Sequence, residues 1–272
     1  MEKLESIIKQ KESEPAPPAT ACKRCGGEAK PKLITILGWR QQEFCDSCSE
    51  AVRKEQERKE AEKQKTDKIS KLLDSSGIMR GKFCRMTFDS FEKQHQGKAF
   101  EAAKEYAKGF GATTKDGLFF YGKAGAGKTH LAVSITRYII EQKQIAVKFA
   151  RVIDLLMDIR RTYNADEYFR TENEMELLRK YSTVQLLILD DLGTEKVTEW
   201  ARQILYQIVD SRWIDDKPII ITSNLTLREL AERFDDRISS RIGGSCEVFE
   251  AKPHDYRIES KEVLSKAMEM PQ

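Results

Sequence analysis

The residues with the clearest chemical meaning are the eight at positions 122–129, which read G-K-A-G-A-G-K-T. Their glycines permit backbone angles, and a close approach to a ligand, that a Cβ atom would forbid. The backbone N–H groups of such a loop point inward and bind phosphate oxygens. Lys128 can reach the terminal phosphates of a nucleotide, and the Thr129 hydroxyl can bind Mg²⁺. We expect the whole segment to bind ATP: Gly122, Lys123, Ala124, Gly125, Ala126, Gly127, Lys128 and Thr129.

A second group of candidate residues follows the apolar run L-L-I-L at 186–189. Asp190 and Asp191 end that run, and two negative charges at the tip of a buried strand are costly unless a cation is present. We expect Asp190 to hold Mg²⁺, directly or through water, and Asp191 to orient or deprotonate the attacking water. A pair of helix N-cap residues is the alternative. Asn224 follows the run P-I-I-I-T-S and is expected to position the same water, unless it only forms a turn or caps the next helix.

Four of the six cysteines lie in two C-x-x-C pairs, Cys22 with Cys25 and Cys45 with Cys48, and 19 residues separate the pairs. Each pair can present two thiolates to one tetrahedral ion, and this spacing is typical of a four-cysteine zinc ribbon or knuckle. The segment L-I-T-I-L-G-W-R between the pairs can form a small hairpin. A module of this size buries little core, so we expect bound Zn²⁺ to supply most of its folding free energy.

The elements that must position these residues form an alternating pattern after residue 85. Short apolar runs bounded by turn or charged residues predict buried parallel strands at 118–121, 145–150, 186–189, 218–222 and 246–250. Helical spacing predicts helices at 98–110, 128–142, 151–161, 197–213 and 226–233. Strands that alternate with helices predict an α/β fold with a right-handed, doubly wound parallel sheet. The phosphate loop then joins the first strand to a helix.

The other segments differ from this pattern in composition. The N-terminal residues are polar and end in P-A-P-P, whereas the stretch after the last paired cysteine is dominated by Lys and Glu. Such charge-rich stretches are typical of solvated helices or tethers. We expect five segments: a flexible N-terminus (1–21), a zinc-binding module (22–50), a charged helical linker (51–84), an ATPase domain (85–258) and a C-terminal tail (259–272).

The bulk properties exclude several classes of protein. The net charge is only +3, so any nucleic-acid surface must be a local patch. No apolar run approaches the roughly 18–20 residues that span a bilayer. The N-terminus M-E-K-L-E-S-I-I-K-Q lacks the apolar core of a signal peptide. We therefore expect a cytoplasmic protein with no membrane partner and with reduced cysteines.

Five motifs, in this order, are similar to those of the DnaC/DnaI-type helicase loaders of the AAA+ superfamily: G-K-A-G-A-G-K-T-H-L-A, L-L-I-L-D-D-L-G-T-E-K, I-I-I-T-S-N-L, D-D-R-I-S-S-R-I and D-Y-R. The resemblance covers residues 85–258 and implies an AAA+ P-loop ATPase with a parallel five-stranded sheet between helices. The phosphate loop and the acidic pair match Walker A and Walker B, and Asn224 matches sensor 1. Arg241 matches the arginine finger that reaches a neighbouring subunit's γ-phosphate, and Arg257 matches sensor 2, which implies self-association through the ATP sites. Either arginine can instead be an ordinary surface or helix-end residue.

The same resemblance implies an ATP-dependent loader that places a DnaB-type replicative helicase on single-stranded DNA and grips the helicase with its zinc module. A zinc ribbon can equally contact DNA, and Lys23, Arg24, Lys30 and Lys32 leave that alternative open. The region 151–182 corresponds to the helical segment that faces single-stranded DNA in this family. Its Arg160, Arg161 and Tyr163 suit nucleic acid, although they suit the charged face of an amphipathic helix equally well. An IstB-like transposition helper, which has a similar core, is the main alternative function. A third is a nucleotide-gated adaptor with weak hydrolysis, because many AAA+ proteins have glutamate where this chain has Asp191.

Overall fold

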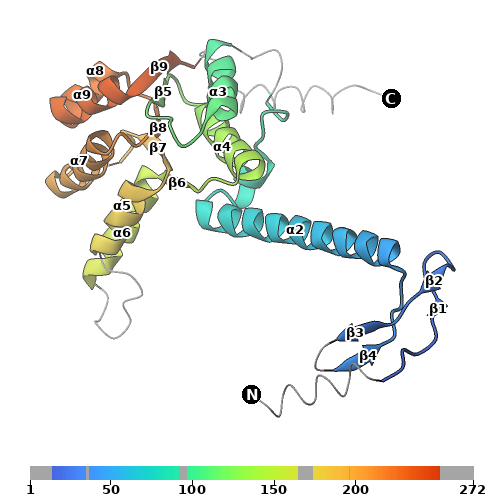
Figure 1. Ribbon diagram of the computed structural model, residues 1–272. Coiled ribbons are helices and arrows are strands. Elements are labelled where there is room, and N and C mark those ends of the chain that lie inside the picture. Colours follow the sequence, from blue (N-terminus) through green and yellow to red (C-terminus); the bar gives the residue numbers. More distant parts are fainter. Residues whose placement is uncertain (1–13, 35–36, 92–96, 165–173, 196, 252–272) are drawn as a thin grey trace, which may run out of the picture. The chain divides into compact units, whose positions relative to one another are not determined.

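The structure is a computed structural model that describes residues 14–34, 37–91, 97–164, 174–195 and 197–251 (Figure 1). The chain folds as two compact units, Met1–Asp67 and Lys68–Gln272. None of the helices in the described ranges is long and apolar enough to cross a membrane.

Two small antiparallel sheets and the start of a long helix make up the described part of the first unit. β1 (Thr20–Ala21) pairs with β2 (Glu28–Ala29), and β3 (Lys32–Ile34) pairs with β4 (Gly38–Arg40). The second pair is the hairpin that the apolar segment between the cysteine pairs predicts. The first C-x-x-C pair lies in the turn between β1 and β2, and the second lies where the long helix begins.

The long helix α2 (Asp46–Ser76) has 31 residues and covers most of the predicted linker. Ion pairs at i,i+4 spacing run along it, and one of them joins Lys54 to Glu50 at 2.8 Å. Residues 53–68 are all exposed, so this part of the helix has no apolar face to bury. The i,i+4 charge pairs and the straight-chain residues therefore account for its helical conformation.

The C-terminal end of α2 belongs to the second unit and is anchored there. Ile69 and Leu72 pack on the core of that unit. Gly77 then ends the helix with a φ of +94°, and a Cβ atom at this position would lie 2.4 Å from the carbonyl oxygen of Phe149. Only glycine fits such an approach to a strand. Residues 77–84 of the predicted linker are consequently not part of the helix, and a short 3₁₀ turn, η1 (Gly81–Arg85), follows.

Five parallel strands form the sheet of the second unit, in the order β6-β7-β8-β5-β9. They are β5 (Gly117–Tyr121), β6 (Val147–Arg151), β7 (Leu186–Leu192), β8 (Ile219–Ser223) and β9 (Cys246–Glu250). The predicted five-stranded parallel sheet is thus confirmed. Because the strands are parallel, the C-terminal ends of β5, β7 and β8 lie at one edge of the sheet, where α/β proteins place their ligands.

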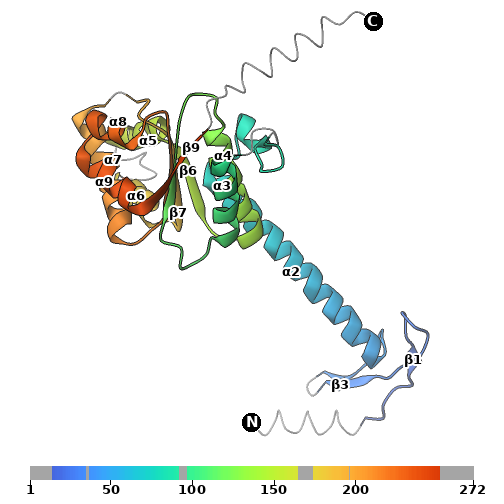
Figure 2. The ribbon, with the colours of Figure 1, turned by 90° about the horizontal axis from the view of Figure 1, so that it is seen from above.

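Helices cover both faces of this sheet, and the strand residues alternate between them. Phe119, Leu187 and Ile221 pack with one group of helices, whereas Phe120 and Ile188 pack with the other. The first group is α5 (Val152–Asn164), α6 (Glu174–Thr183), α7 (Glu199–Ile214), α8 (Leu227–Arg233) and α9 (Asp236–Ser245). The second group is α3 (Lys98–Gly109) and α4 (Lys128–Tyr138), and α4 continues into a π-helical turn, η3 (Ile139–Lys143). Figure 2 shows the resulting three layers of the second unit.

Helical spacing in the sequence predicts neither α6 nor α9, although α6 lies in the region 151–182 that the family resemblance implies is helical. α9 contains two consecutive glycines and three serines, so its intrinsic helix propensity is low. Its buried residues are Ile238 and Ile242, one turn apart, which is too short a pattern to detect. α6 is similarly short and buries Leu178 and Tyr181. Burial against the sheet, rather than local preference, therefore determines that these segments are helical.

Candidate nucleotide site and cysteine cluster

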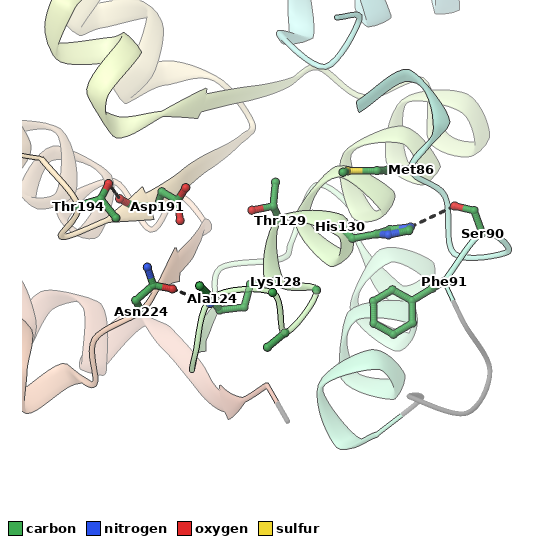
Figure 3. Close-up of a pocket in the computed structure, with 13 residues that line it drawn as sticks. Met86, Ser90, Phe91, Ala124, Lys128, Thr129, His130, Asp191, Thr194 and Asn224 are labelled. Carbon is green, nitrogen blue, oxygen red and sulfur yellow. Dashed lines mark hydrogen bonds between the residues drawn. The ribbon is translucent and has the colours of Figure 1, made fainter. Parts of the chain in front are cut away.

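A pocket of about 390 Å³ opens at the C-terminal edge of the sheet (Figure 3). Its lining comprises residues 124–130 of the phosphate loop and α4, then Asp191, Thr194 and Asn224 from the ends of β7 and β8, and finally Met86, Ser90 and Phe91. The three predicted motifs, which are far apart in sequence, therefore meet at one concave site. Such a mixed polar and apolar pocket suits a nucleotide, which has charged phosphates at one end and a flat apolar base at the other.

The phosphate loop joins β5 directly to α4, as the sequence predicts. Gly127 is the N-cap of α4 and has a φ of +82°. Gly122 has a φ of +138°, and a Cβ atom there would lie 2.7 Å from the carbonyl oxygen of Ala251. These two glycines let the loop turn tightly, so that the unsatisfied N–H groups at the start of α4 face the pocket and can bind an anion.

Lys128 has its ammonium fixed by three oxygen atoms. It donates hydrogen bonds to the carbonyl oxygens of Gly122 at 2.7 Å and Lys123 at 2.9 Å, and to the Oδ1 atom of Asn224 at 2.9 Å. The side chain is buried, with a relative exposure of 5%. A phosphate oxygen that enters the loop would exchange with one of these acceptors, so the lysine is already positioned for it.

Asp190 is almost completely buried at the end of β7, with a relative exposure of 1%. Thr222 donates a hydrogen bond of 2.7 Å to its Oδ1 atom, and Thr129 donates one of 3.2 Å to its Oδ2 atom. Burial raises the pKa of Asp190 to about 6, even though these hydrogen bonds act in the opposite direction. An ionised carboxylate at this position is therefore poorly compensated by the protein alone.

The donor atoms at Asp190 fit Mg²⁺. An alcohol and a carboxylate are the oxygen ligands that this ion takes, and two adjacent oxygens of an octahedral Mg²⁺ site lie about 2.9 Å apart. Thr129 Oγ1 and Asp190 Oδ2 are separated by 3.2 Å, so one ion can contact both after a small adjustment. The charge of the ion would also compensate the buried carboxylate.

Asp191 has a different orientation because its backbone is left-handed, with a φ of +62°. Its N–H donates a hydrogen bond of 2.9 Å to Thr222 Oγ1, the same hydroxyl that binds Asp190. The register between β7 and β8 is irregular here, and Asp191 lines the pocket. Aspartate adopts left-handed angles more readily than glutamate, which gives a physical reason for the shorter acid at this position.

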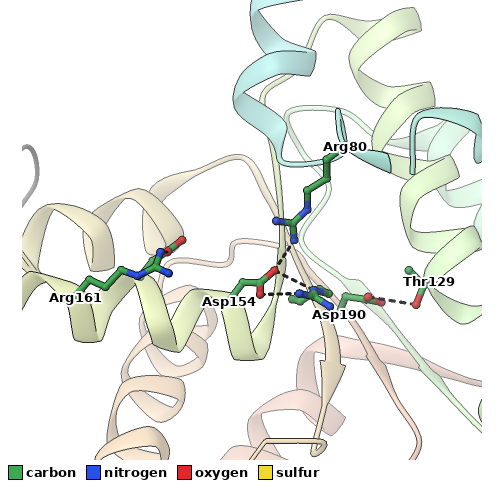
Figure 4. A network of polar contacts seen from close by, with 7 residues as sticks. Arg80, Thr129, Asp154, Arg161 and Asp190 are labelled. Carbon is green, nitrogen blue, oxygen red and sulfur yellow. Dashed lines mark hydrogen bonds and ion pairs between the residues drawn. The ribbon is translucent and has the colours of Figure 1, made fainter. Parts of the chain in front are cut away.

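A further cation, Arg151, lies beside the acidic pair, at the end of β6. Arg151 is the register partner of Asp190, and it donates two hydrogen bonds, of 2.9 and 2.7 Å, to Asp154 at the start of α5. Asp154 also pairs with Arg80, which follows α2 (Figure 4). These bonds to Asp154, and more weakly the charges of Asp190 and Asp191, raise the pKa of Arg151. The sequence prediction did not include this network.

The wall formed by Met86, Ser90 and Phe91 was also missed. Ser90 lies 3.1 Å from His130 Nε2, and the ring of Phe91 contacts the imidazole edge-on, with 5.1 Å between centroids. Thr87 and Ser90 each accept a hydrogen bond from the other's backbone N–H. The sequence feature that could have revealed this wall is the segment T-F-D-S-F at 87–91, because two hydroxyl residues three positions apart can form such a reciprocal turn. Since the pocket's polar groups lie at the strand ends, this apolar wall suits the base of the nucleotide.

Of the two arginines that were predicted to act on the nucleotide, the structure describes Arg241 but not Arg257. Arg241 lies on α9, is not among the residues that line the pocket, and pairs with Asp210 at 2.8 Å. Arg257 lies outside the residues that the structure describes. In the predicted DNA-facing region, Arg160 and Arg161 are exposed on α5, whereas the side chain of Tyr163 and residues 165–173 lie outside what the structure describes.

The four paired cysteines come together in the first unit. Their sulfur atoms all lie within 4.8 Å of one another, and those of Cys25 and Cys45 are 3.7 Å apart. A tetrahedral zinc ion with bonds of 2.3 Å would separate its sulfur ligands by about 3.8 Å, so the cluster fits Zn²⁺. Backbone hydrogen bonds, chiefly at Cys25, lower the pKa of Cys22 to about 6, whereas thiol hydrogen bonds with Cys45 and Cys25 raise the pKa of Cys48 to about 12.

Comparisons with known proteins agree with this geometry. A family model described as IstB-like ATP binding protein matches residues 58–263. The replicative helicase loader DnaC of Buchnera aphidicola subsp. Baizongia pistaciae is 32% identical over 218 residues, which are 78% of this chain and 82% of that protein. A crystal structure of the DnaC helicase loader, 27% identical, matches with a TM-score of 0.55 over 62% of this chain and 97% of the other.

A crystal structure of DnaI has the same fold, with a TM-score of 0.52 at 24% identity over 63% of this chain and 90% of that chain. The family match covers more than half of the chain and includes every motif of the pocket. The chain therefore belongs to the IstB-like ATP-binding protein family, and it is also a relative of the DnaC replicative helicase loaders.

Proposed function

We propose that this protein is an ATP-dependent loader of a DnaB-type replicative helicase, which it helps to place on single-stranded DNA. The observation that carries the proposal is the pocket in which Lys128, Asp191 and Asn224 converge, on a chain whose relatives are named helicase loaders. ATP binding and hydrolysis then determine when the helicase is captured and when it is released.

The roles of the pocket residues follow from their positions. The phosphate loop binds the phosphates of ATP through its N–H groups, and Lys128 neutralises the terminal ones. Asp191 accepts a proton from the attacking water, and Asn224 fixes the position of that water. Thr129 and Asp190 hold Mg²⁺, which supplies positive charge to the phosphate oxygens when it is bound.

The remaining catalytic groups come from outside this pocket. Arg241 lies on α9, away from its own pocket lining, so it acts on the γ-phosphate of ATP in a neighbouring copy of the chain. A guanidinium fork suits that position because it stabilises the charge that spreads over the phosphate oxygens. Arg257 serves as sensor 2 of the same site. The active ATPase is consequently an oligomer.

The first unit contributes the adaptor. Cys22, Cys25, Cys45 and Cys48 bind one Zn²⁺, which holds short strands that bury little apolar surface. The β3–β4 hairpin exposes two apolar side chains, those of Ile34 and Leu37, and exposed apolar surface that is gathered in one place suits a protein partner better than it suits DNA. The helicase therefore binds here, and single-stranded DNA binds along α5 and α6.

Steady-state hydrolysis with and without single-stranded DNA, combined with capture of the replicative helicase of the source organism, tests the proposal. Helicase capture by the wild-type chain, together with loss of hydrolysis in Lys128→Ala, is the expected result. Arg241→Ala is expected to bind ATP normally and to hydrolyse it on the order of 10³-fold more slowly. Mixing Arg241→Ala with Lys128→Ala should restore part of the activity, because some interfaces then combine an intact finger with an intact loop.

Two other outcomes would identify the alternatives. Binding and bending of duplex DNA without helicase capture would indicate a transposition helper, in keeping with the name of the matching family. Helicase capture that needs ATP but proceeds without measurable hydrolysis would indicate a nucleotide-gated adaptor.

A further inference from the structure

Residues of a neighbouring helix, chiefly Asp210 and Trp213, hold the guanidinium of Arg241. Its Nε atom donates a hydrogen bond of 2.8 Å to Asp210 Oδ1, and its Cζ atom lies 3.9 Å from the centre of the Trp213 ring. Asp210 and Trp213 are three residues apart on α7 and therefore lie on the same face of that helix. α7 and α9 lie side by side in both views of the fold (Figures 1 and 2).

The ion pair with Asp210 does not use the two terminal amino groups of Arg241, although the side chain of Tyr206, on the same helix as Asp210, also interacts with the guanidinium. Arginine binds a phosphate in a bidentate manner through adjacent N–H groups of its planar fork. The bond to Asp210 uses Nε, so that carboxylate does not occupy the two terminal amino groups. The Trp213 ring supports one face of the guanidinium and is itself 43% exposed, which places the stacked pair at the molecular surface.

We propose that Asp210 and Trp213 are positioning residues that hold Arg241 in one conformation, ready for the γ-phosphate of ATP in a neighbouring copy of this chain. This inference rests on the proposed function of Arg241 as a finger that acts between subunits. A free arginine side chain must lose its rotamer freedom each time it meets a phosphate. A side chain that is already fixed by an ion pair and an aromatic ring has lost that freedom in advance.

A structural role for the same contacts makes different predictions. If the ion pair and the ring only join α7 to α9, their removal lowers the melting temperature and leaves the turnover of the assembled protein unchanged. If they position the finger, their removal lowers kcat, whereas the affinity for ATP stays the same because the lining of the protein's own pocket does not include them.

The test compares four single variants of the full chain at a protein concentration that saturates assembly. Trp213→Leu removes the aromatic face and Asp210→Asn removes the charge, and each is expected to lower kcat about fivefold with an unchanged Kd for ATP. Trp213→Phe keeps a ring face and is expected to retain most of the wild-type kcat. Arg241→Ala gives the kcat of a protein that lacks the arginine finger. If Trp213→Leu does not fold, Asp210→Asn alone still tests the proposal.

The outcomes separate this inference from the function on which it rests. Wild-type turnover in both Trp213→Leu and Asp210→Asn, with a large loss in Arg241→Ala, would overturn the positioning role and leave the finger intact. Undiminished turnover in Arg241→Ala would overturn the finger itself, and the positioning role with it.

A spectroscopic measurement adds a readout that does not depend on turnover. In the double variant Trp39→Phe, Trp200→Phe, Trp213 is the remaining tryptophan. Because the ring is partly exposed, we expect its emission to shift to shorter wavelength when a non-hydrolysable ATP analogue drives assembly. An unchanged spectrum in a sample that sediments as an oligomer would show that this surface does not meet the neighbouring copy, and would overturn the inference.

Discussion

The ammonium of Lys128 and the amide oxygen of Asn224 are joined by a hydrogen bond of 2.9 Å, which links the phosphate loop to the end of β8. The two residues are 96 positions apart in the sequence. Because of this contact, a change in the position of Lys128, which is expected to bind phosphate, alters the hydrogen bonding of Asn224, which is expected to hold the attacking water. When a phosphate oxygen attracts Lys128, Asn224 loses a partner and its amide becomes available to water.

Substitution of Asn224 tests this coupling. Asn224→Asp places a carboxylate 2.9 Å from the Lys128 ammonium. This carboxylate competes with the γ-phosphate for the ammonium and also repels the phosphate, because both groups are negatively charged. We expect ATP affinity to fall by about tenfold or more. Asn224→Ala removes the amide without adding a charge, so affinity should change by less than about threefold while single-turnover hydrolysis falls by about 10²-fold.

Binding of a fluorescent ATP analogue and single-turnover hydrolysis measure the two effects separately. Lys128→Ala serves as the reference for loss of phosphate binding. If Asn224→Ala were to lose affinity to the same extent as Lys128→Ala, the amide would contribute to binding, and its assignment to the attacking water would be wrong.

Glu195 provides a prediction about pH. Its side chain is buried, and both carboxylate oxygens accept a hydrogen bond from the N–H of Gly193, at 3.1 and 3.3 Å. Burial raises the pKa of Glu195 above its ordinary value of 4.5. The folded protein therefore holds this proton more tightly than the unfolded chain does. The resulting stabilisation is fully present below pH 4.5 and is lost as the pH rises through the pKa of the folded state.

Glu195→Gln should consequently raise the melting temperature at pH 8, because glutamine keeps an acceptor for Gly193 and removes the buried charge. Near pH 4 the variant and the wild type should melt at similar temperatures. Thermal unfolding followed by circular dichroism at both pH values measures this, and Glu247→Gln, at an exposed position on β9, is the matched control. An equal increase at both pH values would rule out the ionisation of Glu195 as the cause.

The site could be predicted where a motif is continuous in sequence and could not where tertiary packing creates it. The phosphate loop, the acidic pair and Asn224 each follow an apolar strand, and parallel strands bring their ends together. The wall at Met86 and Phe91 has no such rule, because those residues reach the pocket from a segment that precedes α3. Its position depends on packing of neighbouring aromatic residues against α3 and α4, which local sequence does not reveal.

Arg212 is a further example of a residue whose role only the structure reveals. On α7 it was one charged residue among many, yet it is completely buried. Its guanidinium donates hydrogen bonds to five backbone carbonyl oxygens, those of Tyr181, Ser182, Val184, Gln185 and Pro218. Burial lowers the pKa of Arg212 to about 10, so the group is still charged at neutral pH. It joins the end of α6 and the turn before β7 to the residue that precedes β8.

Arg212→Met should therefore destabilise the second unit strongly. Methionine fills a similar volume but leaves the carbonyl oxygens without their donor, and we expect a loss on the order of 3 kcal/mol or more in the free energy of unfolding. Arg202→Met is the control on the same helix, since it removes only the partly exposed ion pair with Glu199 and should cost less than about 1 kcal/mol. Urea-induced unfolding measures the free energy of unfolding of both variants. Similar losses in the two would show that the carbonyl contacts of Arg212 contribute little to stability.

Removal of the metal should affect the two units differently. Apart from the start of α2, the described part of the first unit consists of short strands around four cysteines, so we expect these strands to unfold when zinc is taken away. The second unit has its own core on both faces of a five-stranded sheet, and it should keep its fold and its affinity for ATP. Metal analysis of protein purified without chelators should give one equivalent of zinc per chain.

Cys25→Ser is the variant that tests this division. It should lose the zinc and the ability to capture the helicase, whereas Cys84→Ser, at an exposed cysteine outside the cluster, should lose neither. ATP affinity is expected to match the wild type in both variants, because the pocket is built entirely from the second unit. Zinc content well below one equivalent in the wild-type protein would contradict the metal assignment. A Cys25→Ser protein that binds no zinc but still captures the helicase would instead place the helicase contact outside the first unit.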